Sequence, residues 1–454
     1  MKFNELKISE DFKKNLESQG YINLTPIQEL SLNSSLEGRD LIARAKTGSG
    51  KTLAFSLPIV EKLRVKEFKV QALLLAPTRE LANQIAQNLR LLFRHIHNVK
   101  ILTLCGGVPF KPQVVSLNHQ AHIIVGTPGR VLKHLGEKNL NLDFVDTFVL
   151  DEADKMLDMG FFEDIEKVAS FLPKKRQTML FSATYTDDIK NLVSNILDNP
   201  LHIEVENEEK NIIKQEFYAL EEREKAQNIK KLIRSFEAKS TIIFCNQKIT
   251  CEDLADILHD DGLDVLTMHS DLEQKQRDET LILFSNQTYP ILIASDVASR
   301  GLDIDDVDLV INYDLALNSK IHTHRIGRTA RAGKGGVAIS FFTNDEEQRA
   351  NEFKEIFDDI EFKDAKTIRD NSNFEIDLGL RAIFINGGKK HKLRKMDILG
   401  SLTAGIGLDK DDIGKIDVLD FCSYVAVKKD KLNIILDRLN KTKIKGKYYN
   451  IYEK

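Results

Sequence analysis

The chain has 454 residues, of which 42% are hydrophobic and 30% charged, and its net charge is −4. This composition is typical of a globular protein with buried cores, and the length favours about three domains. The N-terminus lacks the apolar stretch of a secretory signal, and no apolar run is long enough to span a bilayer, which argues against secreted and membrane-spanning proteins.

The charge and the cysteines are informative once they are placed along the chain. Residues 381–454 hold 17 Lys and Arg against 9 Asp and Glu, so this tail carries +8 and the rest of the chain −12. A basic C-terminal module suggests nucleic-acid binding, although a solvated Lys-rich face is the alternative.

Four cysteines show neither a CxxC pair nor a metal-ligand spacing, so we expect buried thiols in a reduced, cytoplasmic protein: Cys105, Cys245, Cys251 and Cys422.

The first chemically informative segment is a glycine-rich turn between a predicted strand at residues 40–44 and a predicted helix at residues 53–63. A strand, a glycine-rich turn and Lys-Thr before a helix form a phosphate-binding loop, in which Lys51 reaches the β- and γ-phosphates and Thr52 binds Mg²⁺. Ala45 stands where the common pattern has its first glycine, and an ordinary strand–helix turn is the alternative. The expected nucleotide-binding loop comprises Ala45, Lys46, Thr47, Gly48, Ser49, Gly50, Lys51 and Thr52.

Short apolar runs then recur with helical patterns between them. Such runs predict parallel strands buried on both faces, at residues 70–76, 122–125, 147–150 and 179–181, and again at 241–244, 265–268, 291–294 and 309–312. Two doubly wound α/β domains follow from this repetition. We expect charged or polar linkers at residues 204–210 and 363–377.

An acidic tetrapeptide, Asp151-Glu-Ala-Asp154, follows the predicted strand at 147–150. A carboxylate at a strand end near a phosphate loop is well placed for Mg²⁺, so we assign Asp151 to the metal and Glu152 to deprotonation of the attacking water. By itself such a tetrapeptide is more often a solvated turn. Ser182 and Thr184 follow the next predicted strand, where their hydroxyls could bond the acidic residues and couple the site to the nucleotide state; a helix N-cap is the alternative.

Residues 379–454 have a different pattern. We predict strands at 381–386, 413–420, 421–429 and 443–452 and helices at 396–404 and 432–439. The order β-α-β-β-α-β is the split βαβ arrangement of RRM-type modules.

Taken together, the phosphate loop and the acidic tetrapeptide resemble those of the DEAD-box RNA helicases. Further ordered matches support the resemblance: Pro77-Thr-Arg-Glu-Leu81, Gly106-Gly107, Thr127-Pro-Gly-Arg130, Ser182-Ala-Thr184, Gln274-Lys-Gln-Arg277, Ala298-Ser-Arg-Gly-Leu-Asp303 and His324-Arg-Ile-Gly-Arg-Thr-Ala-Arg331. The resemblance implies an RNA-dependent ATP hydrolase that uses ATP and Mg²⁺. It also implies two tandem RecA-like domains, at residues 1–205 and 215–360, followed by an RRM-like α+β domain at 379–454. We expect a monomer without a membrane partner.

The same resemblance assigns roles around the nucleotide. Residues 20–28 resemble the adenine-reading Q motif, in which the amide of Gln28 matches the adenine edge and the ring of Tyr21 stacks. Phe3 is as well explained by core packing. Arg328 and Arg331, three residues apart, are expected on one helical turn as arginine fingers, with surface ion pairs as the alternative, and Asp303 is expected at the ribose. Ala330 replaces the family's usual glycine, and we expect little effect.

RNA contacts are expected from residues after the strands, because Thr, Arg and Gly N–H groups suit phosphates and 2′-hydroxyls. They are Pro77, Thr78, Arg79, Gly106, Gly107, Thr127, Gly129 and Arg130 in the first domain and Arg277 and Ser295 in the second. This arrangement predicts a core that is indifferent to RNA sequence and unwinds locally.

The tail resembles that of the DbpA branch of the family through residues 385–394, 397–400, 413–417, 424–427 and 443–447. The branch implies recognition of a hairpin in large-subunit ribosomal RNA and a role in ribosome assembly. Cys422 and Val427 stand where an RRM exposes rings, so we expect RNA contacts from a basic loop instead. That loop comprises Lys389, Lys390, Lys392 and Arg394, assisted by Lys443, Lys445 and Lys447.

Two other functions stay open from the residues alone. One is a non-catalytic RNA-binding scaffold with a vestigial nucleotide pocket, against which Lys51, Asp151, Glu152 and Arg328 argue. The other is a DNA helicase, because spacing does not reveal contacts to 2′-hydroxyls.

Overall fold

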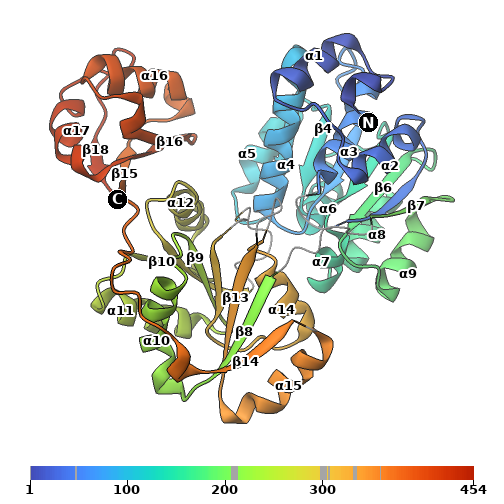
Figure 1. The fold of residues 1–454 in the computed structure, drawn as a ribbon. Coiled ribbons are helices and arrows are strands. Elements are labelled where there is room, and N and C mark those ends of the chain that lie inside the picture. The colour runs from blue at the N-terminus through green and yellow to red at the C-terminus, as the bar shows by residue number, and fades with distance from the viewer. Residues whose placement is uncertain are drawn as a thin grey trace. The chain divides into compact units, whose positions relative to one another are not determined.

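The structure, a computed structural model, describes residues 2–45, 49–205, 213–296, 304, 307–330, 335–357 and 359–454. The chain divides into two compact units, Met1–Glu208 and Glu209–Lys454, which are described separately (Figure 1).

The first unit is built on a seven-stranded parallel sheet in the order β3-β4-β2-β5-β6-β1-β7. Its strands are β1 (Leu41–Arg44), β2 (Ala72–Leu75), β3 (Ile101–Leu104), β4 (Ile123–Gly126), β5 (Thr147–Leu150), β6 (Gln177–Ser182) and β7 (Leu201–Glu204). Alternate residues of each strand face opposite sides. Leu74 therefore lies in the core on one face of the sheet, whereas Leu73 and Leu75 lie in the core on the other. The predicted doubly wound fold is confirmed.

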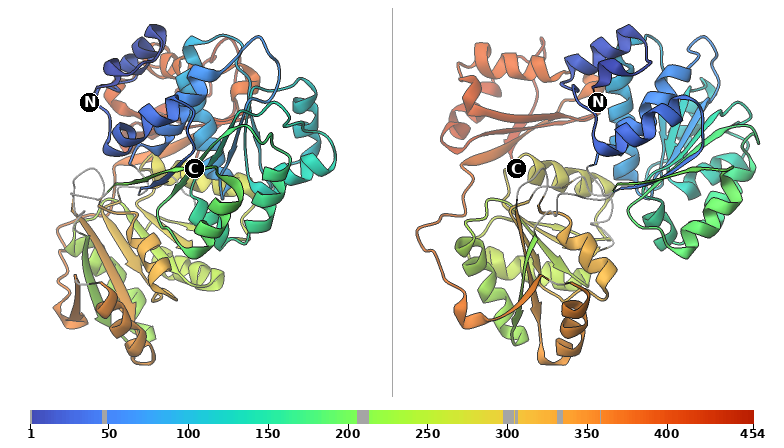
Figure 2. Two further views of the ribbon diagram at one scale, coloured as in Figure 1. Left: turned by 90° about the vertical axis from the view of Figure 1, so that its right-hand side faces the viewer. Right: turned by 45° about the vertical axis from the view of Figure 1, so that its right-hand side comes forward.

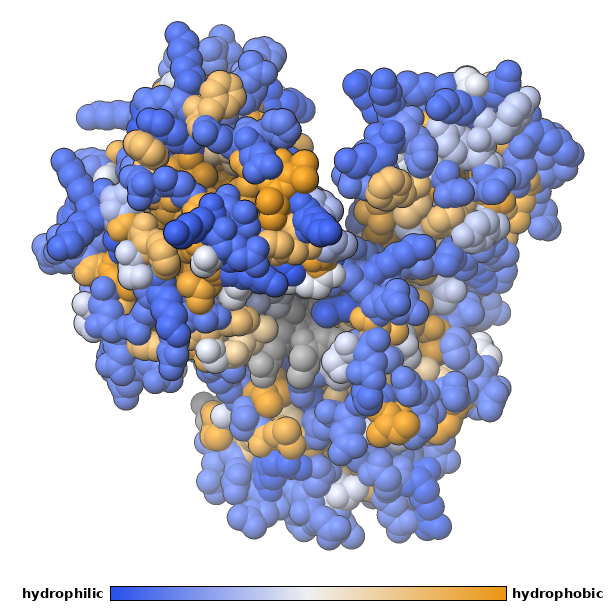
Figure 3. All heavy atoms as spheres, turned by 180° about the vertical axis from the view of Figure 1, so that it is seen from behind, coloured by the Kyte–Doolittle hydropathy of each residue, from blue (hydrophilic) through white to orange (hydrophobic). Residues whose placement is uncertain are grey.

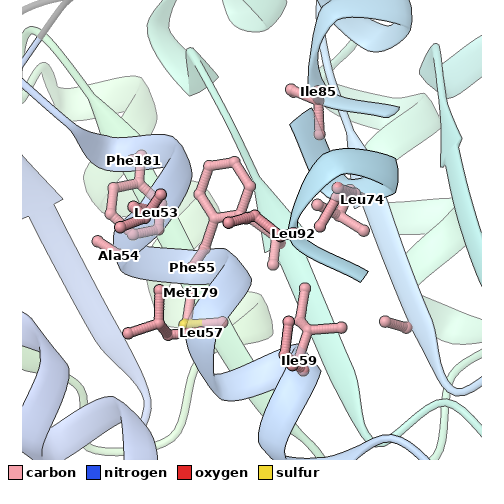
Figure 4. Packing of buried hydrophobic residues seen from close by; sticks show 14 of the residues in the cluster. Leu53, Ala54, Phe55, Leu57, Ile59, Leu74, Ile85, Leu92, Met179 and Phe181 are labelled. Carbon is pink, nitrogen blue, oxygen red and sulfur yellow. The ribbon is translucent and has the colours of Figure 1, made fainter. Parts of the chain in front are cut away.

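Helices cover both faces of this sheet (Figures 1 and 2). One core is formed with α1 (Glu10–Ser18), α2 (Pro26–Leu36), α3 (Lys51–Lys62) and α4 (Arg79–Leu92). The other is formed with α5 (Phe110–Asn118), α6 (Pro128–Gly136), α7 (Ala153–Asp158), α8 (Phe162–Ser170) and α9 (Asp187–Ile196). Figure 4 shows how α3 is held: Phe55 and its neighbours pack with Leu74, Met179 and Phe181. This packing fixes the start of α3, where the phosphate loop ends.

The second unit begins with another parallel seven-stranded sheet, in the order β10-β11-β9-β12-β13-β8-β14. Its strands are β8 (Ile213–Ala219), β9 (Thr241–Cys245), β10 (Val265–Met268), β11 (Ile291–Ser295), β12 (Leu309–Asn312), β13 (Gly336–Phe342) and β14 (Ile360–Asp364). On one face pack α10 (Glu222–Ser235) and α11 (Lys248–Asp260). On the other pack α12 (Gln274–Ser285), α14 (Ser319–Ile326) and α15 (Glu347–Ile356).

The expected linker at residues 363–377 is partly structured. Lys363 and Asp364 belong to β14, which pairs with β8, and Ala365, Ile368 and Ile376 pack against the core on the α10 face. The prediction was wrong for Lys363 and Asp364, which belong to a strand, and the few apolar residues of the rest of the segment pack on the preceding domain.

The C-terminal part is a four-stranded antiparallel sheet in the order β16-β17-β15-β18. It comprises β15 (Leu380–Ile385), α16 (Lys395–Gly400), β16 (Ile413–Val418), β17 (Ser423–Lys428), α17 (Leu432–Leu439) and β18 (Ile451–Glu453). The predicted β-α-β-β-α-β order is confirmed. The last strand is shorter than predicted, and the first helix continues as a π-helical turn at Ser401–Gly405.

The surface and the cysteines agree with a globular protein. On the face drawn in Figure 3, hydrophilic residues dominate and hydrophobic ones form small scattered groups. All four cysteines are free and buried, as predicted. Within the described ranges, no helix is both long enough and apolar enough to cross a membrane.

Candidate nucleotide and RNA sites

The strand order of the first unit sorts the candidate residues into two groups. The phosphate loop, the acidic tetrapeptide and the Ser182–Thr184 segment lie at the ends of β1, β5 and β6, which are adjacent, whereas Tyr21 and Gln28 precede β1. The predicted RNA residues follow β2, β3 and β4, which are also adjacent. In a parallel sheet these carboxyl ends share one edge, where ligands of α/β folds bind. The sheet thus presents two neighbouring candidate sites along a single edge.

The end of the phosphate loop is held by the segment upstream of α2. The Thr25 hydroxyl donates to the Ser49 carbonyl at 2.7 Å, and the Gln28 amide nitrogen donates to the Gly50 carbonyl at 2.9 Å. Gly50 has φ +93°, and a Cβ there would lie 2.4 Å from the Gln28 nitrogen. Only glycine fits this close approach without strain. Of the predicted loop residues, Lys46, Thr47 and Gly48 lie outside the described residues.

The side chain of Gln28 is engaged within the protein but keeps bonding capacity. Its Oε1 accepts from the Thr25 N–H at 2.9 Å, so Oε1 and Nε2 each make one bond in the segment. A primary amide has two donors and two acceptor lone pairs, so one of each is left to pair with a base edge. Tyr21 is 42% exposed and therefore accessible for stacking, whereas Phe3 is buried in the core, which favours its packing interpretation.

Asp151 is a buried carboxylate beside the loop lysine. Its backbone N–H donates to the Leu75 carbonyl, and its Oδ1 accepts from the Glu152 N–H at 3.0 Å. Burial raises the pKa of Asp151 to about 6, and the positive charge of Lys51 only partly offsets that effect. Lys51 is itself buried and donates to the Ala45 carbonyl at 3.0 Å. A buried carboxylate whose negative charge is only partly balanced by a neighbouring lysine suits a divalent cation, because added positive charge would stabilise its ionised form.

Glu152 occupies a strained backbone position at the start of α7, with φ +54°. Left-handed backbone at a non-glycine residue is uncommon and concentrates at functional sites. The carboxylate is buried, and its Oε2 forms an ion pair with Lys155 Nζ at 2.8 Å. This lysine, three residues ahead on the same helix, was not singled out from the sequence, although its spacing would have indicated the contact.

Asp154 connects the acidic tetrapeptide to the segment after β6. Its Oδ2 accepts from the Ala183 N–H at 3.2 Å, the Thr184 N–H at 3.1 Å and the Thr184 hydroxyl at 3.2 Å. The Ser182 hydroxyl in turn accepts from the Thr184 N–H at 3.3 Å. The structure therefore brings Thr184 to Asp154, an acidic residue that sequence reasoning did not single out, while the Ser182 hydroxyl bonds only the Thr184 N–H.

The predicted RNA residues of the first unit lie after three adjacent strands. Thr78 caps α4 by accepting from the Leu81 N–H, so its hydroxyl has a structural role besides the predicted contact with RNA. Arg130 donates from one nitrogen to the Val108 carbonyl and to Gln113 Oε1, both at 3.1 Å. The remaining members of the group are Pro77 and Arg79 after β2, Gly106 and Gly107 after β3, and Thr127 and Gly129 after β4.

The second unit contains a buried arginine that sequence reasoning missed. Arg325 on α14 is 1% exposed and forms a two-nitrogen pair with Asp296 at 2.6 and 2.7 Å. It also donates to the Asp314 carbonyl and to Asn246. A buried charge with this many partners ties the ends of β9, β11 and β12 together. Ser295, a predicted RNA residue, ends β11 directly before Asp296.

The predicted helical turn carrying Arg328 was wrong. α14 ends at Ile326 and Gly327 is its C-cap, so Arg328 lies beyond the helix and is 8% exposed. Ala330 has φ +58°, which explains physically why a glycine suits this position. The other predicted members of this group, Arg331 and Asp303, lie outside the described residues.

The basic loop of the tail is exposed. Lys389 and Lys390 belong to a short 3₁₀ turn, Lys392 follows it, and none of the three forms an ion pair with another described residue. Lys445 is different, because its Nζ donates to the Lys392 carbonyl and pairs with Asp397 at 3.1 Å. Arg394 is exposed at the start of α16.

Side chains of β17 alternate between the two faces of the tail's sheet. Val427 faces the core with Val425, while Cys422 and Tyr424 face the other side. The sequence analysis placed both Cys422 and Val427 at positions where an RRM exposes rings. This prediction was wrong for Val427, because residues five apart on a strand point to opposite sides of the sheet.

Three family profiles match the chain in order: DEAD/DEAH box helicase at residues 25–192, Helicase conserved C-terminal domain at 224–333, and DbpA RNA binding domain at 382–453. Among curated relatives, the ATP-dependent RNA helicase DbpA of Escherichia coli (strain K12) is 44% identical over 434 residues, covering 95% of each chain. The protein of the same name from Bacillus subtilis (strain 168) is 36% identical, covering 99% of this chain and 98% of the relative.

Solved structures are similar to most of the chain. Dbp5 of S. cerevisiae bound to RNA and ADP BeF3 is 32% identical, with a TM-score of 0.71, over 80% of this chain and 95% of that one. Mss116p bound to ssRNA and AMP-PNP is 28% identical, with a TM-score of 0.71, over 80% and 79% of the two chains.

Proposed function

The chain belongs to the DbpA group of the DEAD-box ATP-dependent RNA helicases, and from this we propose that its RNA-dependent ATP hydrolysis is directed to a hairpin of large-subunit ribosomal RNA. The observation that carries the proposal is the match of residues 382–453 to the DbpA RNA binding domain. The unpaired basic loop of that tail supports it, since exposed lysines suit a phosphate backbone. A role in assembly of the large ribosomal subunit follows from such a target.

ATP is held, in this proposal, by the phosphate loop and by the segment before α2. Gln28 and Tyr21 take the adenine, Lys51 the β- and γ-phosphates, and Thr52 with Asp151 the Mg²⁺. The raised pKa of Asp151 supports the metal assignment, because burial has left this carboxylate short of positive charge. The metal would supply charge neutralisation at the phosphates.

Glu152 acts on the attacking water. Its carboxylate, held by Lys155, orients the water and takes its proton. Arg328 and Arg331 supply positive charge to the outermost phosphate, and Asp303 binds the ribose, as the family resemblance implies. Asp154 with Thr184 couples the site to RNA, since one carboxylate holds two N–H groups and a hydroxyl of the segment after β6.

RNA is bound through its backbone in the two parallel-sheet domains and through the basic loop in the tail. The residues after β2, β3 and β4 offer hydroxyls, guanidiniums and glycine N–H groups, which suit phosphates and 2′-hydroxyls more than bases. Sequence preference therefore comes from the tail. The cytoplasmic location and the monomeric state stay predictions.

The test replaces two unpaired lysines and keeps the tail in place. The Lys389→Glu/Lys390→Glu variant should need about tenfold more large-subunit ribosomal RNA for half-maximal ATPase stimulation, with a salt slope smaller by about one to two. Stimulation at saturating poly(U) should not change. The matched control is Lys410→Glu/Lys441→Glu, which alters two other exposed lysines of the tail. Unchanged half-maximal stimulation in the first variant would refute the targeting role of the basic loop.

A further inference from the structure

A buried polar cluster joins two of the predicted RNA-binding segments of the first unit. Its centre is Gln113 on α5, a residue that sequence reasoning did not single out and that is 9% exposed. The Gln113 Nε2 donates to the Cys105 carbonyl at 3.1 Å. Its Oε1 lies 3.1 Å from Arg130 Nη1 and 2.9 Å from His134 Nε2. One side chain thus connects the end of β3 with two residues of α6.

The orientation of this amide is set by the chemistry of its partners. A guanidinium only donates and a peptide carbonyl only accepts, so Oε1 faces Arg130 and Nε2 faces Cys105. Burial, with the charge of Arg130 adding to it, lowers the pKa of His134 to about 4, so this ring is neutral near pH 7. The neutral ring must carry its single N–H on Nε2 in order to donate to Oε1. The amide of Gln113 therefore fits in one orientation only.

The same contacts bracket the glycine pair that we expect to bind RNA, Gly106-Gly107. The residue before the pair is Cys105, whose carbonyl is held by Gln113. The residue after the pair is Val108, whose carbonyl accepts from Arg130 Nη1 at 3.1 Å. The glycine pair and the arginine are thereby joined into one unit, although they belong to segments that follow different strands.

The guanidinium of Arg130 is held on one side and keeps donors on the other. Its Nη1 makes both bonds, to Val108 and to Gln113. Its central carbon lies 5.5 Å from the centre of the Phe110 ring, which stacks on His134 at 4.2 Å with an interplanar angle of 15°. Among the residues that the structure describes, Nε and Nη2 of Arg130 have no hydrogen-bond partner. The three N–H groups on these atoms match two oxygens of a phosphate.

Two further features favour a phosphate at this guanidinium. Lys133 Nζ lies 4.8 Å from the centre of the same Phe110 ring, so a second positive charge stands beside that of Arg130. An arginine side chain that is free in solution also loses rotamer freedom when it binds a ligand. A side chain that is already held in its binding position loses less, so it binds more tightly.

We propose that Gln113 is a positioning residue for RNA binding, whose amide holds the Arg130 guanidinium and the Gly106-Gly107 backbone in one arrangement before RNA arrives. Both groups then bind the same strand together. The inference rests on RNA binding by these two segments, as proposed above, and adds the residue that makes them act as one. Gln113 itself does not touch the RNA.

The test compares four full-length variants, each checked for folding by circular dichroism and thermal melting. Gln113→Met removes the amide and keeps a side chain of similar length. Gln113→Glu keeps an acceptor for Arg130 and His134, but its charge offsets that of the guanidinium. Arg130→Met removes the phosphate contact itself, and Gln113→Met/Arg130→Met combines the two changes. The matched control is Gln87→Met, at an exposed position of α4.

Stimulation of ATP hydrolysis by poly(U) measures RNA binding without the preference of the tail. Half-maximal stimulation should need about tenfold more poly(U) in Gln113→Met and in Arg130→Met, and the rate of Gln113→Met at saturation should stay within twofold of the parent. A tenfold change corresponds to about 1.4 kcal/mol, as expected for a hydrogen bond to a charged group. Gln87→Met should behave as the parent.

Two readouts separate positioning from a merely structural role. The salt slope of half-maximal stimulation should fall by about one in Gln113→Met, Gln113→Glu and Arg130→Met, because each loses one effective phosphate contact. The double variant should be at most about threefold worse than Arg130→Met, because Gln113 acts largely through that arginine. Independent effects would multiply to about a hundredfold loss.

Unchanged stimulation in a folded Gln113→Met, or a hundredfold loss in the double variant, overturns the positioning role. If Gln113→Met does not fold, an unchanged salt slope in Gln113→Glu overturns it. The RNA contact of Arg130 survives either result as long as Arg130→Met is impaired. If Arg130→Met is not impaired, that contact fails and the positioning role fails with it. Targeting to ribosomal RNA is judged separately, by Lys389→Glu/Lys390→Glu.

Discussion

Replacement of Asp151 by Asn should make the nucleotide-free protein more stable while abolishing ATP hydrolysis. Asp151 is 4% exposed, and its pKa is raised from 3.8 to about 6, chiefly by burial. Asn keeps an oxygen that accepts the Glu152 N–H but carries no charge that burial could destabilise. The residue that we assign to Mg²⁺ therefore lowers the stability of the fold that holds it.

The size of this effect follows from the shift. Because the folded-state pKa exceeds the unfolded value, the unfolded state ionises at lower pH, and stability falls as pH rises from about 4 to about 6. A shift of about two pKa units corresponds to about 3 kcal/mol, at 1.36 kcal/mol per unit, and this cost is fully present above pH 6. At pH 5 about half of it should remain, and below pH 3.8 none.

The assay is denaturant unfolding of the first unit at pH 8 and pH 5. The chain contains no tryptophan, so Phe171→Trp, at a residue that is 48% exposed, gives a fluorescence signal from this unit alone. In that background Asp151→Asn should raise the free energy of unfolding by up to about 3 kcal/mol at pH 8. Asp143→Asn, at an exposed position, is the control and should change little.

Two results would refute the reasoning. If Asp151→Asn is no more stable than its parent at pH 8, burial does not destabilise the carboxylate. If the gain is the same at pH 5 as at pH 8, the stabilisation has a cause other than the loss of a titrating charge.

Three further predictions concern other residues. Asp154→Ala removes the acceptor of three N–H groups and the Thr184 hydroxyl. Unwinding should fall at least about tenfold while RNA-stimulated ATPase changes by less than about threefold, and equal losses would contradict a coupling role. Ala330→Gly relieves a left-handed backbone and should raise the free energy of unfolding of the second unit by about 1 kcal/mol in denaturant titrations, whereas a loss would show that φ +58° carries no strain. His322 is buried, and burial lowers its pKa to about 3. Below pH 6.5 this residue therefore takes up a proton when the protein unfolds, and the free energy of unfolding falls with acidification by up to about 1.4 kcal/mol per pH unit. His322→Gln should remove one proton from that slope; equal slopes in the parent and the variant would contradict the assignment.

Much of the fold could be predicted because its elements are encoded locally. Strands buried on both faces appear as continuous apolar runs, and β5, β10 and β12 begin and end where the pattern predicted. Five strands were not predicted: β3, β7, β8, β13 and β14. In β8 and β14, polar and charged residues interrupt the apolar pattern. The end of α14 at Ile326 was missed because the helix pattern says little about a glycine cap followed by left-handed backbone at Ala330.

The sequence by itself determined the chemistry that this protein contains: a phosphate loop, an acidic tetrapeptide after a buried strand, and a basic module of β-α-β-β-α-β order. These follow from residue type and spacing over a few positions. Only the tertiary structure decided that Gln28 bonds the Gly50 carbonyl, that Asp154 is the partner of Thr184, and that Leu283 packs with Phe384 and Tyr424 of the tail's sheet. Each joins segments far apart in the chain, and such partners are selected by the packing of whole elements, which no local pattern records.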